Sequence, residues 1–181
     1  MKEMKTTAQV LVDCLEAEGV DVMFGIPGEE TLDLMFAIRD SKIRFIPVRH
    51  EQGAAFMADV YGRLTGRAGV CLSTLGPGAT NLVTGVADAY LDGAPLVAIT
   101  GQVGTDRMQL TSHQYLDLTA MFEPITKRSK QIIRPDTVGR DRAAGLQARR
   151  KGQAGRDPHR PAPEYCKNAR RRRAAQVPAD A

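Results

Sequence analysis

The chain has few cysteines and histidines, and their spacing builds no covalent or metal framework. Cys14, Cys71 and Cys166 show neither a pairing scheme nor the spacing of metal ligands. Cys14 and Cys71 fall on apolar faces of predicted elements, so we expect both to be reduced core residues. His113 and His159 lack ligand partners at metal spacing. The sequence therefore offers no metal site, and no Ser-His-Asp arrangement is suggested.

Long apolar runs and phosphate-binding fingerprints are also missing. The first residues, 1–5, are not followed by the apolar stretch of a signal peptide, and no run approaches membrane-spanning length. We therefore expect a cytoplasmic protein without a membrane partner. Neither G-x-G-x-x-G nor G-x-x-x-x-G-K-[ST] occurs. Their absence argues against a nucleotide-binding module.

The pattern that is present alternates short apolar runs with segments of helical periodicity. We predict strands in residues 20–24, 43–48, 69–75 and 96–99, with Gly19 and Gly93 ending helices. Alternation of this kind predicts an α/β fold: a doubly wound parallel sheet with helices on both faces. The helical apolar positions are Val10, Leu11, Cys14 and Leu15; Leu32, Met35, Phe36 and Ile38; Met57, Val60, Tyr61 and Leu64; and Leu82, Val86, Ala89 and Tyr90.

Glu51 is the strongest candidate for a catalytic residue. It lies in R-H-E-Q-G-A-A-F-M-A, after the strand predicted to end at Val48 and in the first turn of a helix running to about Thr65. Ligands of open α/β sheets bind at the carboxyl ends of the strands. Apolar surroundings would favour the neutral carboxyl group, which could then donate a proton near neutral pH. The alternative is an acid that only offsets the helix macrodipole.

Two glycine-proline turns follow two other predicted strands. They are the segments 25–28, G-I-P-G, and 76–78, G-P-G. Proline fixes φ and glycine allows close backbone approach, so each turn can hold rigid backbone against a flat ligand. Each turn alone would be an ordinary connection between secondary-structure elements. Together with Glu51 they mark three strand ends and predict one site.

These segments resemble the N-terminal, pyrimidine-binding domain of thiamine-diphosphate enzymes, in particular the catalytic subunit of acetolactate synthase. The resemblance covers about residues 5 to 136 and rests on R-H-E-Q-G-A together with G-P-G-A-T-N-L. Oxalyl-CoA decarboxylases, glyoxylate carboligases and pyruvate oxidases share much of this pattern. The stretches T-S-H-Q-Y-L-D and P-I-T-K look closer to synthases that work without flavin.

The resemblance implies a function and a set of site residues. Glu51 would be catalytic and share a proton with a ring nitrogen of the aminopyrimidine, and the cofactor would decarboxylate pyruvate and join the product to a second 2-keto acid. Another 2-keto-acid decarboxylase or carboligase is the alternative, and a nucleotide- or nucleic-acid-binding module is disfavoured. The residues implied to bind the cofactor are Gly25, Pro27, Gly28, Glu51, Thr74, Gly76, Pro77, Gly78, Asn81 and Gln114.

Partners and further cofactors are implied in the same way. The family forms homodimers or homotetramers, some with a small regulatory subunit, and serves branched-chain amino acid biosynthesis. Magnesium binds through a Gly-Asp-Gly…Asn motif in the family's third domain, and FAD is left open as a further cofactor. Gly-Asp-Gly does not occur in these 181 residues. We therefore expect the chain to be inactive by itself.

The composition changes after Val138. Residues 1–138 hold 13 basic and 17 acidic residues, a net charge of −4, whereas residues 139–181 hold 12 and 4, a net charge of +8. Residues 139–181 contain too few large apolar residues to compensate their ordering entropy, so we expect a disordered basic tail behind an incomplete domain of residues 1–138. The run Arg170 to Arg173 also fits a nucleic-acid arm, although we expect no nucleic-acid partner.

A frameshift is our preferred explanation of this tail. With suitable synonymous codons, residues 156–168 read one base later give A-T-H-I-D-L-P-P-N-I-A-K-M. That reading resembles the H-I-D-L-P-x-N-I with which the family closes its first domain. Residues 140–149, shifted likewise, give an amphipathic helix where the family has one. The genomic DNA would test this hypothesis directly.

Overall fold

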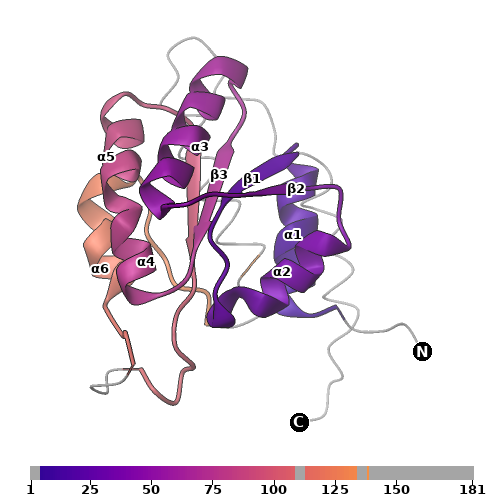
Figure 1. The fold of residues 1–181 in the computed structure, drawn as a ribbon, viewed down its shortest axis with the longest axis vertical. Helices are drawn as coiled ribbons and strands as arrows, with labels where there is room; N and C mark the ends of the chain where they lie inside the picture. The colour runs from indigo at the N-terminus through magenta and orange to yellow at the C-terminus, as the bar shows by residue number, and fades with distance from the viewer. Residues whose placement is uncertain (1–4, 109–112, 134–137, 139–181) are drawn as a thin grey trace, which may run out of the picture.

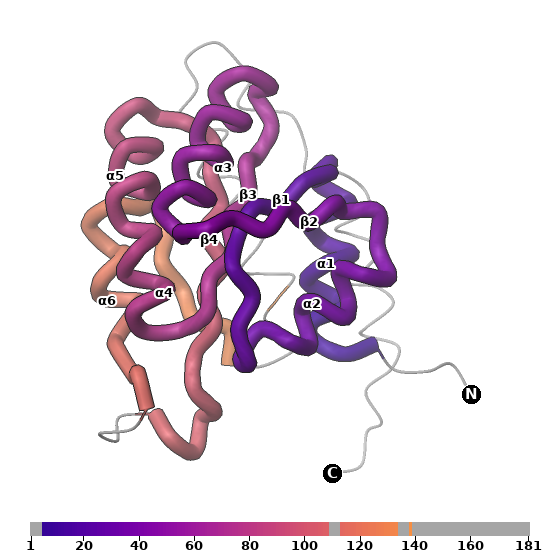
Figure 2. Tube along the Cα trace, in the orientation of Figure 1, coloured from indigo at the N-terminus to yellow at the C-terminus, as the bar shows by residue number. Residues whose placement is uncertain are grey.

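Four strands form one parallel sheet in the order β2-β1-β3-β4; β2, β1 and β3 are labelled in Figure 1, and β4 in Figure 2. The computed structural model describes residues 5–108, 113–133 and 138. The strands are β1 (Val22–Gly25), β2 (Arg44–Pro47), β3 (Gly69–Ser73) and β4 (Leu96–Thr100). Each of the four predicted strands is present, with its ends shifted by at most two residues. The predicted parallel sheet is confirmed.

Helices cover both faces of this sheet, as the fold prediction required (Figures 1 and 2). On one face α1 (Thr7–Ala17) and α2 (Leu32–Arg39) pack over β1 and β3. On the other face lie α3 (Glu51–Thr65), α4 (Gly76–Asn81), α5 (Val83–Leu91) and α6 (Leu118–Phe122). Two short 3-10 helices, η1 (Glu29–Thr31) and η2 (Glu123–Ile125), complete the described elements.

The central strand β3 divides the core between these two layers. Val70 and Leu72 point into the α1/α2 layer, whereas Cys71 points into the α3/α5 layer. All five residues of β3 are buried, as expected for a strand covered on both sides. Burial raises the pKa of the Cys71 thiol to about 12. Cys14 is also buried and free, so both cysteines are the core residues that the sequence predicted.

The buried face of α3 differs from the sequence prediction. The sequence predicts Met57, Val60 and Leu64 on its apolar face, but they are 48%, 49% and 82% exposed. The core side carries small residues instead: Ala54, Ala55, Ala58 and Gly62. A Cβ added at Gly69 of β3 would overlap the carbonyl oxygen of Ala58. Only small side chains fit where helix and strand approach this closely.

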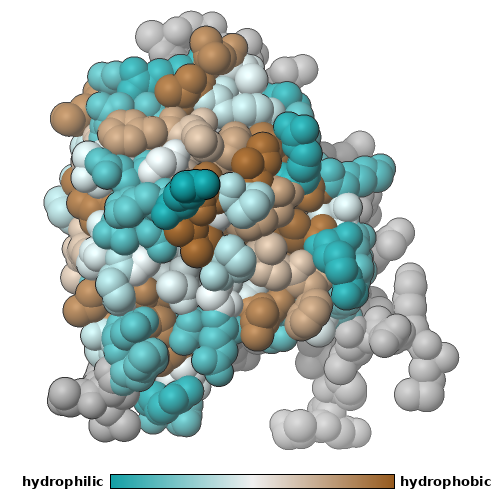
Figure 3. Space-filling model, viewed as in Figure 1, coloured by the Kyte–Doolittle hydropathy of each residue, from teal (hydrophilic) through white to brown (hydrophobic). Residues whose placement is uncertain are grey.

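The exposed apolar residues of α3 form an outer stripe of the molecule. Phe56, Met57, Val60 and Leu64 follow one another at helical spacing on this helix. Figure 3 shows apolar side chains at the surface over α3, among polar ones. In α2, likewise, Leu32 and Phe36 are about half exposed. The helical periodicity thus predicted the helices, but on α3 and in part on α2 it selected the wrong face.

Several predictions fall at the ends of elements or outside the described residues. Gly19 and Gly93 take positive φ values of 80° and 66°, as residues that end helices do. Val138, the last residue of the predicted domain, is buried, with 1% of its surface exposed. The predicted disordered tail, residues 139–181, and with it Cys166 and His159, lie outside the described residues. Among the described helices, none is long and apolar enough to span a membrane.

Candidate functional site

Three parallel strands end at one edge of the sheet, and the predicted site residues follow them there (Figure 1). The register pairs Gly25, the last residue of β1, with Pro47 of β2 and with Leu72 of β3. The chain then enters the turn at 25–28, the start of α3 at Glu51 and the start of α4 at Gly76. The segment 76–78, predicted as a turn between elements, is thus the first turn of a helix. The order of the strands brings these segments, distant in sequence, to the same edge.

Glu51 is the first residue of α3, and its side chain is buried although it is ionisable. The residue is 8% exposed, and its Oε2 accepts a hydrogen bond of 2.9 Å from Nδ2 of Asn81. Oε1 lies 3.2 Å from the position that a Cβ on Gly78 would take. Asn81 therefore holds one oxygen of the carboxyl group, and the second lies over a residue without a side chain. That oxygen can meet a ligand.

The turn at 25–28 and the first turn of α4 are joined through Thr74. A Cβ added at Gly28 would lie 2.5 Å from Cβ and Oγ1 of Thr74. A Cβ added at Gly78 would lie 2.9 Å from Cγ2 of the same threonine. Any larger residue at either position would have to displace Thr74, so glycine is required by space at both. Gly28, Thr74, Gly78, Glu51 and Asn81 thus form one continuous set of contacts, called the slot below.

Gln114 reaches this region from a later segment of the chain. Gly76 has a φ of 49°, and a Cβ there would lie 2.5 Å from the carbonyl oxygen of Gln114. Gln114 itself has a φ of 54°, a conformation that residues other than glycine seldom adopt. Backbone in the left-handed region costs free energy and occurs often at functional sites. The structure thus brings Gln114 next to Gly76.

The remaining predicted residues have a packing role or lie at the surface. Gly25 is buried in β1 beside β3, where an added Cβ would overlap the carbonyl oxygen of Leu72, so a side chain has no room there. Pro77 is exposed and lies in the first turn of α4, where proline favours helix initiation. Pro27 is exposed in the turn after β1. None of the contacts described for these three residues reaches Glu51.

Two residues near the slot were not predicted from the sequence. Glu30 accepts a hydrogen bond of 2.6 Å from Oγ1 of Thr74. Gly101 follows β4 directly, and a Cβ there would lie 3.1 Å from Cβ of Glu30. Gly101 could have been found, because it is a glycine after a predicted strand, like Gly25 and Gly76. Glu30 gave no signal, since an acid in a turn is ordinary in any sequence.

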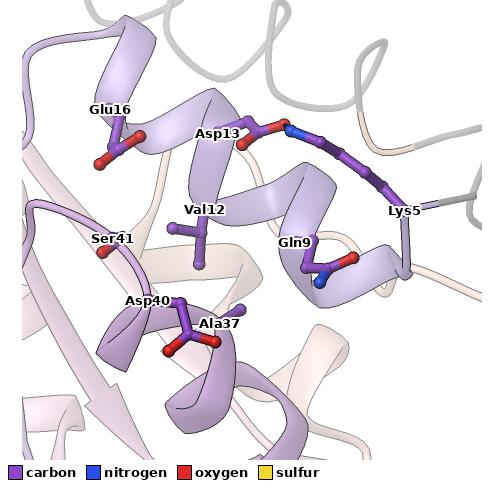
Figure 4. Close-up of a pocket in the computed structure, with 8 residues that line it drawn as sticks. All are labelled: Lys5, Gln9, Val12, Asp13, Glu16, Ala37, Asp40 and Ser41. Atoms are coloured by element: carbon purple, nitrogen blue, oxygen red, sulfur yellow. Dashed lines mark hydrogen bonds and ion pairs between the residues drawn. The ribbon is translucent and has the colours of Figure 1, made fainter. Parts of the chain in front are cut away.

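The described residues hold no group of His, Cys, Asp and Glu side chains arranged to bind a metal ion. A cavity of about 170 Å³ lies elsewhere, between α1 and α2 (Figure 4). Lys5 and Asp13 at its rim pair with each other at 2.6 Å, and Glu16 accepts from the backbone N–H of Lys42 at 2.7 Å. No predicted site residue lines this cavity. Glu51, Asn81 and Thr74 lie instead where the strands end.

His50 caps the helix that carries Glu51, and replacing it should loosen that helix end. Its Nδ1 accepts from the backbone N–H of Gln52 at 3.2 Å, which satisfies one free donor of the first turn. We expect His50→Ala to lower the free energy of unfolding by about 0.5–2 kcal/mol in urea denaturation. His50→Asn can cap in the same way and should retain most of the stability. Equal losses in both variants would contradict the capping role.

The family model described as "Thiamine pyrophosphate enzyme, N-terminal TPP binding domain" matches residues 5–121. The chain is 45% identical over 148 residues to a probable acetolactate synthase large subunit of Methanocaldococcus jannaschii, covering 82% of this chain and 25% of that protein. It is 44% identical over 149 residues to a catabolic acetolactate synthase of Raoultella terrigena, covering 82% and 26%. An acetolactate synthase of Bacillus subtilis is 49% identical over 126 residues, covering 69% and 22%. The chain thus spans about a quarter of the length of these relatives.

Proposed function

Because this chain belongs to the thiamine pyrophosphate enzymes, whose N-terminal TPP binding domain it matches, we propose that the slot receives the aminopyrimidine of thiamine diphosphate. The enzyme of which it forms part would be an acetolactate synthase that condenses pyruvate with a second 2-keto acid. The relatives that carry the name acetolactate synthase support this reaction. The observation that carries the proposal is the buried carboxyl group of Glu51, with one oxygen bound and one available.

The residues of the slot fit a flat heteroaromatic ring. Because Gly28 and Gly78 carry no side chains, Thr74 can pack directly against the backbone of both. Oε1 of Glu51 lies against Gly78, where a ring nitrogen could share its proton. Gln114 beside Gly76 adds a polar group to the same edge. The cofactor, when bound, supplies the electron sink for decarboxylation of a 2-keto acid.

The contribution of this chain is to hold and deliver a proton. Asn81 donates to Oε2 of Glu51 and so fixes the plane of the carboxyl group. The carboxyl group is also buried, so little water can compete with a ring nitrogen for its second oxygen. His50 caps the first turn of α3 and fixes the backbone from which Glu51 projects. Buried small residues anchor the rest of that helix to the sheet.

Titration of the isolated chain with thiamine tests the proposed site. Amide resonances of Gly78, Asn81 and Gln114 should shift in a saturable manner as thiamine is added, whereas those around the cavity between α1 and α2 should stay in place. Shifts scattered over the surface, or none at all, would contradict the assignment. A full-length, in-frame version assayed for acetolactate and for acetaldehyde would separate a synthase from another decarboxylase of the family.

The 181-residue chain should make no acetolactate by itself. The motif expected from the family resemblance to bind magnesium and the diphosphate, Gly-Asp-Gly, does not occur in the sequence. The slot can hold only the pyrimidine side, so the affinity for the cofactor should be low. Purified chain with pyruvate, magnesium and thiamine diphosphate should remain at background, next to an active full-length relative as positive control. Robust turnover would mean that the chain contains a complete site.

Assembly and boundaries form part of the same proposal. The outer stripe of α3 (Phe56, Met57, Val60 and Leu64) is the kind of surface that a homodimer or homotetramer would cover. Magnesium would bind through the family's third domain, and FAD and a small regulatory subunit are left open. We propose that the domain extends over residues 1–138 and that residues 139–181 are read out of frame. Downstream DNA that encodes Gly-Asp-Gly in another frame would support this. The cytoplasmic location stays a prediction.

A further inference from the structure

Thr74 occupies the centre of the slot, and its two branches face different neighbours. Its Oγ1 donates a hydrogen bond of 2.6 Å to Oε2 of Glu30. Its methyl carbon, Cγ2, is the atom nearest to the Cβ position of Gly78, at 2.9 Å. The same Cβ position lies 3.2 Å from Oε1 of Glu51. The hydroxyl group is therefore bound to Glu30, and the methyl group faces the residue against which Glu51 lies.

Glu30 projects from a short helix whose backbone is fixed by its two neighbours, Gly28 and Thr31. It lies in η1, where the backbone N–H of Gly28 donates to Oγ1 of Thr31 at 2.9 Å and Thr31 donates back to the carbonyl oxygen of Gly28. Cβ of Glu30 lies close to Gly101 at the end of β4. A hydroxyl that donates to a charged acceptor forms one of the stronger hydrogen bonds found in proteins. Glu30 can therefore select one rotamer of Thr74.

We propose that Glu30 is a positioning residue that acts through Thr74. By accepting the hydroxyl proton, it keeps the methyl group of Thr74, and not the hydroxyl group, turned toward Gly78 and Oε1 of Glu51. The slot then presents an apolar wall to the ring, and Oε1 has no competing hydrogen-bond partner from Thr74. The proposal rests on the proposed function for the identity of the ligand, whereas the orientation of Thr74 can be measured without any ligand.

Thiamine titration of four variants of the 181-residue chain tests this role. Glu30→Ala should weaken thiamine binding by about three- to tenfold, the ratio expected for one lost hydrogen bond. Glu30→Gln keeps a side-chain oxygen that can accept from Thr74 and should restore most of the affinity. In a Thr74→Val background, where a methyl group replaces the hydroxyl, Glu30→Ala should have no further effect. The two substitutions should therefore be strongly non-additive.

Two results would overturn the proposal. A loss in Glu30→Gln as large as in Glu30→Ala would mean that the negative charge attracts the cationic ligand directly. Additive losses in the double variant would mean that Glu30 acts independently of Thr74.

A second measurement decides the proposal even if thiamine does not bind. Three-bond couplings to Cγ2 report the χ1 rotamer of Thr74 in the ligand-free chain. We expect a single rotamer in the wild type and in Glu30→Gln, and averaging over rotamers in Glu30→Ala. A fixed rotamer in Glu30→Ala would refute the positioning role. Absence of thiamine binding with the expected couplings would instead count against the proposed function alone.

Discussion

Replacing Glu51 with glutamine in an in-frame, full-length version of the enzyme should reduce turnover by about a hundred- to ten-thousand-fold, the range of general acid–base assistance. Glutamine has nearly the same volume, so the packing around the first turn of α3 should not change. Its amide oxygen can accept from Asn81 as Oε2 does now, which leaves its NH₂ group facing Gly78. An amide in that position cannot take up and return a proton, so cofactor activation should suffer while the fold persists.

The rate of proton exchange at C2 of the bound cofactor is the decisive measurement, because it reports activation before any substrate reacts. Circular dichroism and the urea midpoint would establish that the variant is folded. Glu29→Gln is the matched control, since Glu29 is an exposed acid at the same edge of the sheet. It should leave exchange nearly unchanged. If C2 exchange in Glu51→Gln equalled that of the wild type, Glu51 would have no part in activation.

Arg63→Met should strongly destabilise the domain, through the carboxylate that it leaves behind. Arg63 donates to both oxygens of Asp59, at 2.9 and 2.7 Å, and also pairs with Asp88 and Asp92. Asp59 is 1% exposed, and its hydrogen bond raises the pKa of Arg63 above the usual value. Arg63 thus links α3 to α5 and to the residue that ends α5. Methionine keeps the apolar stem but removes every donor.

The expected loss follows from the burial of Asp59. Arg63 is itself partly exposed, but its removal leaves the buried charge of Asp59 uncompensated, which is strongly unfavourable. A domain of ordinary stability has about 5–15 kcal/mol in total, so the urea midpoint should fall markedly. The double variant Arg63→Met/Asp59→Asn removes the charge and should recover part of the loss.

Arg39→Met is the matched control for this prediction. Arg39 pairs with Asp40 at 2.8 Å, but both side chains are more than 60% exposed. Surface pairs of this kind contribute little to stability. If Arg63→Met were as mild as Arg39→Met, the folded chain would not depend on Arg63 to compensate Asp59. In that case the link between α3 and α5 would depend on apolar contacts alone.

Much of the fold could be predicted because its signals are local. Short apolar runs between helical segments predict parallel strands with crossover helices, and all four strands are present. Gly19 and Gly93 follow helices at positions where the backbone must turn with positive φ. Glu51 comes after a strand and begins a helix, so its place at the carboxyl edge follows from the direction of the chain. The family resemblance rests on the same local segments.

Other properties depend on distances that only the folded chain defines. The inward face of α3 consists of alanines and glycine, because β3 and α5 approach the helix too closely for larger residues; helical periodicity pointed to its large apolar residues instead. The link between Thr74 and Glu30 joins residues 44 positions apart, and that between Asn81 and Glu51 spans 30. Sequence by itself determined the strands, the helices and the edge at which they meet. Tertiary structure decided which oxygen of Glu51 is free and which branch of Thr74 faces it, since hydrogen bonds form between side chains that only the packed sheet brings within 3 Å.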